Sequence, residues 1–302
     1  MKKFIINILS FITIVVVIDF GVRFLGNYMQ VHAKGGDTRT TNDLVMNECH
    51  DVLIFGSSRA GHHYDTPYMS EALGLDVYNA GYDGNGVVLS YGLLSMLLGR
   101  YQPLLIIFDV EPAFDINVYA QDNGHKRYIS RLKPYFCDKH VRAIIKDVSS
   151  EEFYKTYSGM IQYNTTIINK LQDNLFGVIS NRKGFRPLQG SYTSNSSKSK
   201  TKSELDTFKV GYVEKFLLLA HSKNIPIVVV ASPKFGEESS DDVQPVKDIC
   251  VRLNVPFWDF YSDSCFMEHR EWFKEPMHLN EKGAREFSRR VLEKISLMST
   301  KG

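Results

Sequence analysis

Five short runs rich in Ile, Val and Leu recur along the chain, and segments with helical periodicity separate them. The runs cover residues 52–55, 76–79, 104–110, 225–231 and 255–260. Continuous apolar runs of this length suit strands that are covered on both faces. Their alternation with helices therefore predicts an α/β fold, a three-layer, flavodoxin-like, doubly wound parallel sheet of about five strands.

The helices expected between and after these strands follow from the spacing of apolar residues. They cover residues 67–73, 87–101, 204–222, 243–253 and 281–297. The last of them places Ala284, Phe287, Val291 and Ile295 on one face, with Asn280 as the expected N-cap. An amphipathic helix of this kind is expected to cover one face of the sheet.

The interval from residue 112 to residue 203 breaks the alternation of strands and helices. It contains aromatic-rich stretches with helical patterns, such as residues 151–175. We therefore expect a largely helical insertion in one domain rather than a second domain. Within it, residues 191–202 are low in complexity, which is typical of a surface loop.

The N-terminal segment has the length and composition of a membrane anchor. Lys2 and Lys3 precede an apolar run that continues to Phe24 with Asp19 as its only acid. As a helix, residues 4–22 would span about 29 Å, close to the thickness of the hydrocarbon core. The flanking lysines predict an N-terminus inside the cell.

We accordingly divide the chain into an anchor (1–26), a polar juxtamembrane stalk (27–48) and an extracytoplasmic domain (49–302) with the insertion at about 112–203. The expected location is the cell membrane, crossed once. A cleaved signal peptide is the alternative, because Val31-His32-Ala33 loosely resembles a cleavage site. That site lies far beyond the end of the apolar run, which favours an uncleaved anchor.

Charge and cysteine spacing exclude several classes of function. The formal net charge is +2, and no basic stripe interleaved with aromatic residues occurs, which argues against nucleic-acid binding. The four cysteines show no CxxC spacing, so we expect no zinc site built from them. The run from His62 to Asp65 offers ligands, but no further cluster supports a metal site. We therefore predict no metal and no cofactor.

Three polar segments are expected to meet at the carboxyl ends of the strands, where open α/β sheets bind ligands. They are Gly56-Ser57-Ser58-Arg59, Asn79-Ala80-Gly81 and Glu275-Pro276-Met277-His278-Leu279-Asn280. A serine there is exposed to ligand, a histidine can take its proton, and an acid three residues earlier can orient the histidine. Each segment also has a purely structural interpretation. The first could be a helix cap, the second a turn, and the third a histidine beside an N-cap.

The order of the three segments resembles the SGNH (GDSL-type) hydrolase family over residues 51–110 and 225–295. The resemblance implies that Ser58 is the nucleophile, His278 the base and Glu275 the acid that orients it. It also implies that the backbone N–H groups of Ser58 and Gly81 bind the oxyanion, with Asn79 in the same block. The anchor is similar to that of members found in bacterial surface-polysaccharide clusters.

The sequence departs from the family at three places. Ser57 replaces the usual aspartate of Gly-Asp-Ser, and Glu275 replaces the usual aspartate before the histidine. No asparagine follows the third strand, where the family places its third oxyanion donor. Asn85 and Asn117 are the substitutes that we consider. Losing one such donor can lower the rate about a hundredfold to a thousandfold.

Two functions follow from these observations. The first is a serine-dependent O-acyl esterase or acyltransferase that acts on an acylated extracytoplasmic glycan, with the surface polysaccharide as partner. The alternative is a catalytically weak glycan-binding or scaffold component of an envelope polysaccharide assembly. In that case aromatic side chains of the insertion would stack on sugars: Tyr154, Tyr157, Tyr163, Phe176, Phe185 and Tyr192.

Overall fold

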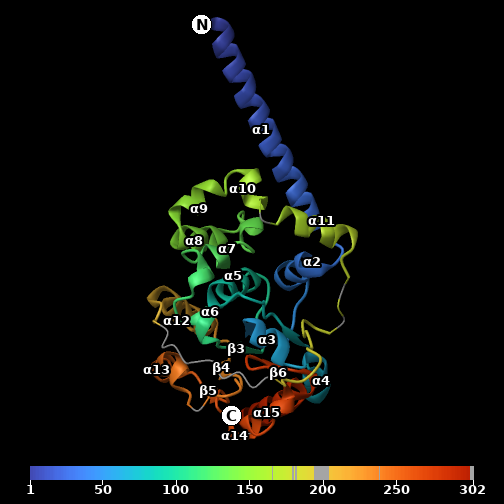
Figure 1. The fold of residues 1–302 in the computed structure, drawn as a ribbon, viewed down its shortest axis with the longest axis vertical. Helices are drawn as coiled ribbons and strands as arrows, with labels where there is room; N and C mark the ends of the chain where they lie inside the picture. Colours follow the sequence, from blue (N-terminus) through green and yellow to red (C-terminus); the bar gives the residue numbers. More distant parts are fainter. Residues whose placement is uncertain (165, 179, 181, 194–203, 238, 300–302) are drawn as a thin grey trace. The chain divides into compact units, whose positions relative to one another are not determined.

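The computed structural model describes residues 1–164, 166–178, 180, 182–193, 204–237 and 239–299. The chain forms two compact units (Figure 1). Residues 1–47 and 121–179 make the first, which we call the helical unit. Residues 48–120 and 180–302 make the second, which we call the sheet unit.

The sheet unit contains a five-stranded parallel sheet with the strand order β2-β1-β3-β4-β5. The strands are β1 (Val52–Gly56), β2 (Val77–Asn79), β3 (Leu105–Asp109), β4 (Ile227–Ala231) and β5 (Phe257–Asp259). This is the strand order of flavodoxin-like folds, and the chain reverses direction across the sheet at β1. The predicted fold class and all five predicted strands are confirmed.

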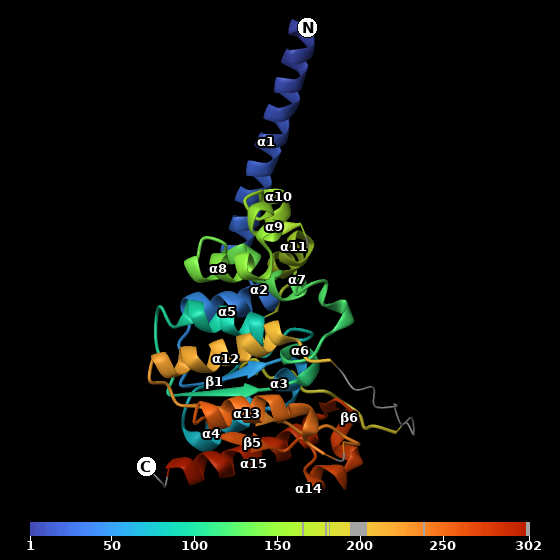
Figure 2. The ribbon, with the colours of Figure 1, turned by 90° about the vertical axis from the view of Figure 1, so that its left-hand side faces the viewer.

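Helices lie on both faces of this sheet, as Figure 2 shows. They are α3 (Ser58–His63), α4 (Thr66–Leu73), α5 (Val87–Leu97), α6 (Pro112–Asp115), α12 (Thr207–Ser222), α13 (Gln244–Arg252), α14 (Ser264–Met267) and α15 (Glu281–Ser299). Asn280 accepts the Gly283 N–H at 3.0 Å, as expected of the N-cap of α15. The predicted helix bounds of 87–101 and 204–222 extend past the observed ones by a few residues.

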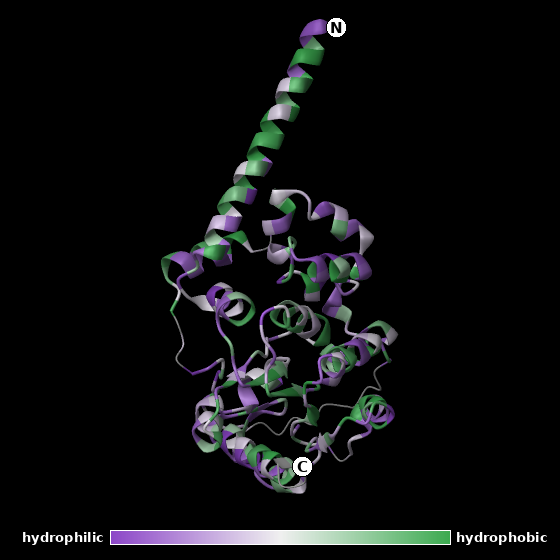
Figure 3. Cartoon of the chain, turned by 180° about the vertical axis from the view of Figure 1, so that it is seen from behind, coloured by the Kyte–Doolittle hydropathy of each residue, from purple (hydrophilic) through white to green (hydrophobic). Residues whose placement is uncertain are grey.

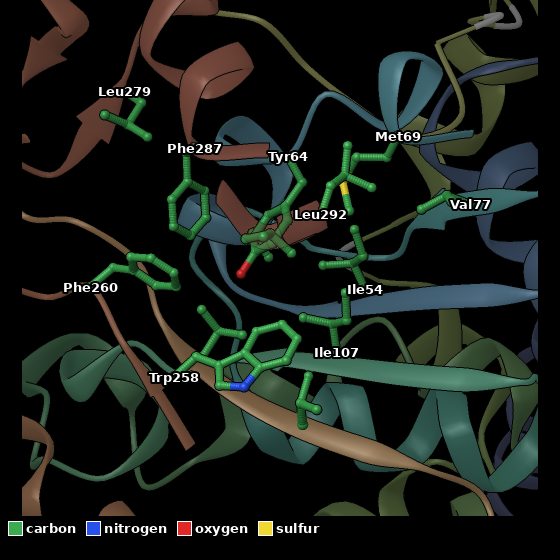
Figure 4. Packing of buried hydrophobic residues seen from close by; sticks show 14 of the residues in the cluster. Ile54, Tyr64, Met69, Val77, Ile107, Trp258, Phe260, Leu279, Phe287 and Leu292 are labelled. Carbon is green, nitrogen blue, oxygen red and sulfur yellow. The ribbon is translucent and has the colours of Figure 1, made fainter. Parts of the chain in front are cut away.

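Alternate residues of each strand serve opposite faces of the sheet, because successive side chains of a strand point in opposite directions. Ile54 and Ile107 belong to a buried cluster that includes Met69 of α4 and Phe287 of α15 (Figure 4). On the other face, Phe55 and Phe108 pack against the ring of Phe216 in α12, with centroids 5.5 and 4.9 Å away. Both faces are thus closed by apolar side chains.

A two-stranded antiparallel hairpin follows the sheet, and the sequence pattern did not predict it. Its strands are β6 (Phe273–Glu275) and β7 (His278–Leu279), with Glu275 paired opposite His278. Pro276 and Met277 form the connection between them. Glu275 and His278 are three residues apart because they face each other across this tight hairpin. The hairpin therefore brings the two side chains close together.

The helical unit contains α1 (Lys2–Val31) and several short helices. These are α2 (Gly36–Asn42), a π-helix over Asp43–Asn47, α7 (Lys126–Ile129), α8 (Lys139–Val148), α9 (Ser150–Lys155), α10 (Gly159–Tyr163) and α11 (Ile167–Leu175). The helical stretch predicted over 151–175 is divided into three helices. The Ser158 side chain caps α10, which explains the interruption between α9 and α10, and the Ser149 side chain caps the start of α9.

The structure differs from the predicted stalk and insertion. Residues 27–47 are mostly helical, and Gln30 donates hydrogen bonds to Asn42 and Tyr135 at 2.7 and 2.9 Å. They therefore pack with residues 121–179 instead of forming an irregular connector. The residues around both ends of the predicted insertion, 112–120 and 180–193, belong to the sheet unit. The predicted surface loop lies largely outside the described residues.

Helix α1 is long and apolar enough to cross a membrane. It has 30 residues, and its most apolar window has a mean hydropathy of 2.5 with no residue buried. Figure 3 shows hydrophobic residues along most of its length. These are the properties of a membrane span or of a signal sequence.

Phe287 is expected to contribute strongly to the stability of the sheet unit. Its ring is fully buried and lies within 5.1 to 5.8 Å of the rings of Tyr64, Phe260 and Phe266. We predict that Phe287→Ala lowers the free energy of unfolding by about 3–5 kcal/mol. Val251→Ala, at a position that is 83% exposed, should change it by less than about 0.5 kcal/mol.

Urea unfolding of the detergent-solubilised protein, followed by tryptophan fluorescence, measures both values. Trp258 and Trp272 both belong to the sheet unit, so the signal reports that unit alone. Equal destabilisation by the two substitutions would contradict the packing described here.

Candidate active site

Ser58 lies at the carboxyl end of β1, where the strand turns into α3. Gly56 has a φ of +150°, and a Cβ there would lie 2.5 Å from the Asp109 carbonyl oxygen, so the turn requires glycine. The Ser57 hydroxyl caps the helix by accepting the Arg59 N–H at 3.3 Å. Ser58 is then the first residue of the helix, and its N–H has no acceptor within the helix.

The structure brings Ser58, His278 and Glu275 together. His278 Nε2 lies 2.7 Å from Ser58 Oγ, across 220 residues of sequence. His278 Nδ1 is hydrogen-bonded to Glu275 Oε1 across the β6–β7 hairpin. The second oxygen of Glu275 accepts the Met277 N–H at 3.0 Å, which fixes the carboxylate in the turn.

Two of these three side chains are accessible to solvent, whereas Ser58 is only 8% exposed. The His278 and Glu275 side chains are 23% and 40% exposed. With Glu275 accepting from Nδ1–H, the imidazole presents Nε2 as the acceptor for the serine proton. A serine hydroxyl, a histidine of this tautomer and a carboxylate in this order can perform nucleophilic acyl transfer.

His63 joins the serine helix to the histidine loop. Its Nε2 accepts the backbone N–H of Leu279, the residue after His278, at 3.0 Å. Its Nδ1–H donates to Ser232 Oγ at 3.0 Å, and that hydroxyl donates to Asp109 at 3.0 Å. Burial, with the Arg59 charge beside it, holds the pKa of His63 well below its usual range. His63 is therefore neutral with one defined tautomer.

Buried charges surround this network at the ends of β1 and β3. Arg59 is fully buried, and its Nε donates to Ser232 Oγ at 3.1 Å. Burial raises the pKa of Asp109 to about 6, against the opposing effects of Arg59 and Ser232. The hydroxyl of Ser232 thus receives two hydrogen bonds and gives one, and its orientation is fixed.

Gly81 and Asn79, which we predicted as oxyanion or substrate-binding residues, make hydrogen bonds within the protein. The Gly81 N–H donates to Asn79 Oδ1 at 3.0 Å, and the Asn79 amide donates to the Ala60 carbonyl at 2.6 Å. A Cβ at Gly81 would lie 2.6 Å from the Gly61 nitrogen, so glycine is needed there for close packing against α3. The Ser58 N–H lies at the start of α3.

The two asparagines considered as a third donor also have other surroundings. The Asn85 amide donates to the Asp83 carbonyl at 3.0 Å. Asn117 lies beyond α6, where it forms a β-bridge with Leu205. Neither residue is linked to Ser58 by the hydrogen bonds of the described residues.

The solved structures that this chain resembles are distant from it in sequence. No model of a known protein family matches the chain, and no curated protein matches it. An acetyl xylan esterase, AlAXEase, is 12% identical, with 81% of this chain and 99% of that chain covered and a TM-score of 0.41. A protein from Streptococcus pneumonia described as a "putative platelet activating factor" is 11% identical, with 91% and 97% covered and a TM-score of 0.45. Because both similarities are weak, the chemistry is argued from the site itself.

Sequence reasoning missed the role of two residues near Ser58. Glu111, 3% exposed at the end of β3, accepts a hydrogen bond from the Ser57 hydroxyl. A buried carboxyl group therefore lies beside Ser57, the residue before Ser58. His63 was considered only as a metal ligand, although its position on the helix that begins at Ser58 was a usable signal.

The metal interpretation of residues 62–65 has no support in the geometry. His62 Nδ1 is bonded to the Arg186 carbonyl at 2.5 Å, and both His63 nitrogens are bonded to protein groups. Asp65 pairs with Arg285 at 2.8 Å and caps α4. The three side chains thus serve separate contacts.

Removal of the His63 side chain should destabilise the sheet unit. His63→Leu leaves the buried Leu279 N–H without an acceptor, which costs about 1–3 kcal/mol. His63→Gln supplies both an acceptor and a donor and should recover part of this loss. Urea unfolding at neutral pH measures the three free energies.

The same variants test the depressed pKa of His63. Below pH ~6.5 the unfolded state binds a proton at this histidine that the folded state does not, so the wild-type stability falls with decreasing pH. The slope attributable to one proton is about 1.4 kcal/mol per pH unit. His63→Gln cannot titrate, so its stability deficit relative to the wild type should shrink between pH 7 and pH 5. A deficit independent of pH would show that His63 is not held neutral.

Proposed function

We propose that this chain is a membrane-anchored, serine-dependent O-acyl esterase or acyltransferase. The observation that carries the proposal is the hydrogen-bonded series Ser58 Oγ, His278 Nε2 and Nδ1, and Glu275 Oε1. Three side chains from two distant segments meet in the order that acyl transfer requires. The partial exposure of His278 and Glu275 leaves room for a substrate to approach the series from their side.

In the first half of the reaction, Ser58 Oγ bonds to the acyl carbon while its proton passes to His278 Nε2. The negative charge of the tetrahedral intermediate lies on the former carbonyl oxygen, near the Ser58 N–H at the start of α3. When the ester bond breaks, the departing alkoxide takes the proton from His278. The acyl group then remains on Ser58 as an ester.

In the second half, an acceptor hydroxyl gives its proton to His278 and attacks the acyl carbon. Water as acceptor yields a carboxylic acid, whereas a sugar hydroxyl yields a new ester. Both outcomes restore Ser58. The glycan substrate is proposed from the resemblance of the three segments to SGNH enzymes, including anchored members of polysaccharide clusters.

The proposed location follows from α1. Its apolar length matches the hydrocarbon core, and Lys2 and Lys3 favour an inside N-terminus. The sheet unit would then face the outside of the cell, where surface glycans are found.

A catalytically weak glycan-binding or scaffold protein is the second candidate. The Gly81 N–H is engaged by Asn79, and the Glu111 carboxyl lies one hydrogen bond from Ser57, so few donors are free to stabilise an oxyanion. Of the aromatic residues proposed to stack on sugars, Tyr163 and Phe185 are buried, whereas Tyr154, Tyr157 and Phe176 are exposed. Turnover of a simple ester separates the two candidates.

Turnover of p-nitrophenyl acetate should require both Ser58 and His278. We expect Ser58→Ala and His278→Ala to lower kcat/KM by at least about a thousandfold, because each removes a group that makes a bond or moves a proton. His221→Ala, at an exposed position of α12, is the matched control and should leave turnover unchanged. Wild-type turnover no greater than that of Ser58→Ala would favour the scaffold protein.

Glu275→Gln should lower kcat about tenfold to ten-thousandfold while leaving more activity than Ser58→Ala, because the acid only orients and stabilises the imidazole. Glu275→Asp should retain more activity than Glu275→Gln, since a carboxylate remains. Glu271→Gln, on an exposed acid of the same region, is the control. If Glu275→Gln were silent while His278→Ala was inactive, the site would be a Ser–His dyad.

A further inference from the structure

The other helices of the helical unit contact the C-terminal part of α1. The backbone N–H groups of Gly159 and Met160 donate to Asp19 at 2.9 and 3.0 Å, and Arg23 donates to the Tyr157 carbonyl. A Cβ at Gly159 would lie 2.5 Å from the Asp19 carbonyl oxygen, so α10 touches the backbone of α1. The contacts of α10 with α1 therefore lie close to the C-terminal end of the apolar span.

Helix α11 meets α1 slightly further along. The Asn174 amide donates to the Met29 carbonyl at 2.8 Å, and the Lys170 amine donates to Gln30. Burial lowers the pKa of Lys170 to about 8, so this face of α11 is packed and polar. The contact at Met29 lies about 10 Å along the helix axis from Val22 at 1.5 Å per residue.

Other parts of α9–α11 expose an unusual number of large apolar side chains. Ile168, Leu171 and Leu175 recur at helical spacing on α11 and are 68%, 49% and 62% exposed. Tyr154 and Tyr157 are 68% and 57% exposed. We call these five residues the apolar collar. An exposed apolar helix face such as that of α11 is typical of a site of interaction with a protein or a membrane.

We propose that the apolar collar rests in the headgroup region of the membrane leaflet from which α1 emerges. The most apolar part of α1 has no buried residue. Its exposed apolar surface is followed along the helix by the part that contacts α10 and α11. Side chains reach about 5–6 Å from a helix axis, so those of α11 can lie in the headgroup layer when its axis lies about 10 Å beyond the span. Tyrosines at the end of a span are typical of this layer.

Charge complementarity favours a bilayer as the occupant. Residues 23–47 and 121–179 carry 12 Lys and Arg against 8 Asp and Glu. The sheet unit has the opposite balance, 22 against 25. A net positive charge in a unit that also exposes an apolar helix face is favourable for binding to anionic lipids.

The proposal goes beyond the acyl-transfer site and rests on α1 spanning the membrane. Full-length protein in vesicles of phosphatidylcholine and phosphatidylglycerol tests it through quenching of introduced tryptophans by brominated lipids. Leu171→Trp and Tyr157→Trp report the collar. Leu218→Trp is the matched control, because Leu218 lies on helix α12 of the sheet unit with 45% exposure. The signal of the unsubstituted protein is subtracted in each case.

We expect lipids brominated near the headgroup end of the chain to quench Leu171→Trp and Tyr157→Trp at least about twofold more than Leu218→Trp. Collar tryptophans quenched no more than Leu218→Trp would overturn the proposal and leave the face to a protein partner. Ile12→Trp, within the span, should be quenched by lipids brominated near the methyl end. Absence of that quenching would overturn the anchor itself and is distinguishable from failure of the collar alone.

Discussion

One buried hydrogen bond, from the Leu279 N–H to His63, holds together the two chain segments that form the site. It joins residues 216 positions apart, and it acts on the residue directly after His278. His63 lies on the helix that starts at Ser58, so the positions of Ser58 and His278 depend on one another. Ser232 and Asp109 fix the His63 tautomer from the ends of β4 and β3. The parallel sheet thereby supports the site through three of its strands.

The fold and the meeting of the three segments could be read from the sequence because they depend on patterns of short range. Apolar runs define the strands, and the carboxyl ends of parallel strands share one edge. The β6–β7 hairpin escaped prediction because its strands have three and two residues, too few for a periodic pattern. Glu275 and His278 were nevertheless chosen correctly as neighbours, since their spacing carries the hairpin geometry. Their chemical roles remain predictions.

The oxyanion donors and the stalk show what sequence patterns leave out. Whether the Gly81 N–H is free depends on where the Asn79 side chain turns, and a resemblance between segments does not contain that information. Residues 27–47 were predicted to be polar and irregular. Their polar side chains instead form hydrogen bonds with a segment about 100 residues away, such as the bond from Gln30 to Tyr135. Buried polar contacts of this kind are set by tertiary packing rather than by local composition.

The proposed chemistry requires that Ser58 is a nucleophile activated by His278. Reaction of the full-length protein with a fluorophosphonate, followed by mass spectrometry of its peptides, tests this claim without knowledge of the natural substrate. We expect a phosphonate adduct on Ser58 that forms much more slowly in His278→Ala and is absent from Ser57. An unmodified Ser58, or an adduct that forms equally fast without His278, would contradict it.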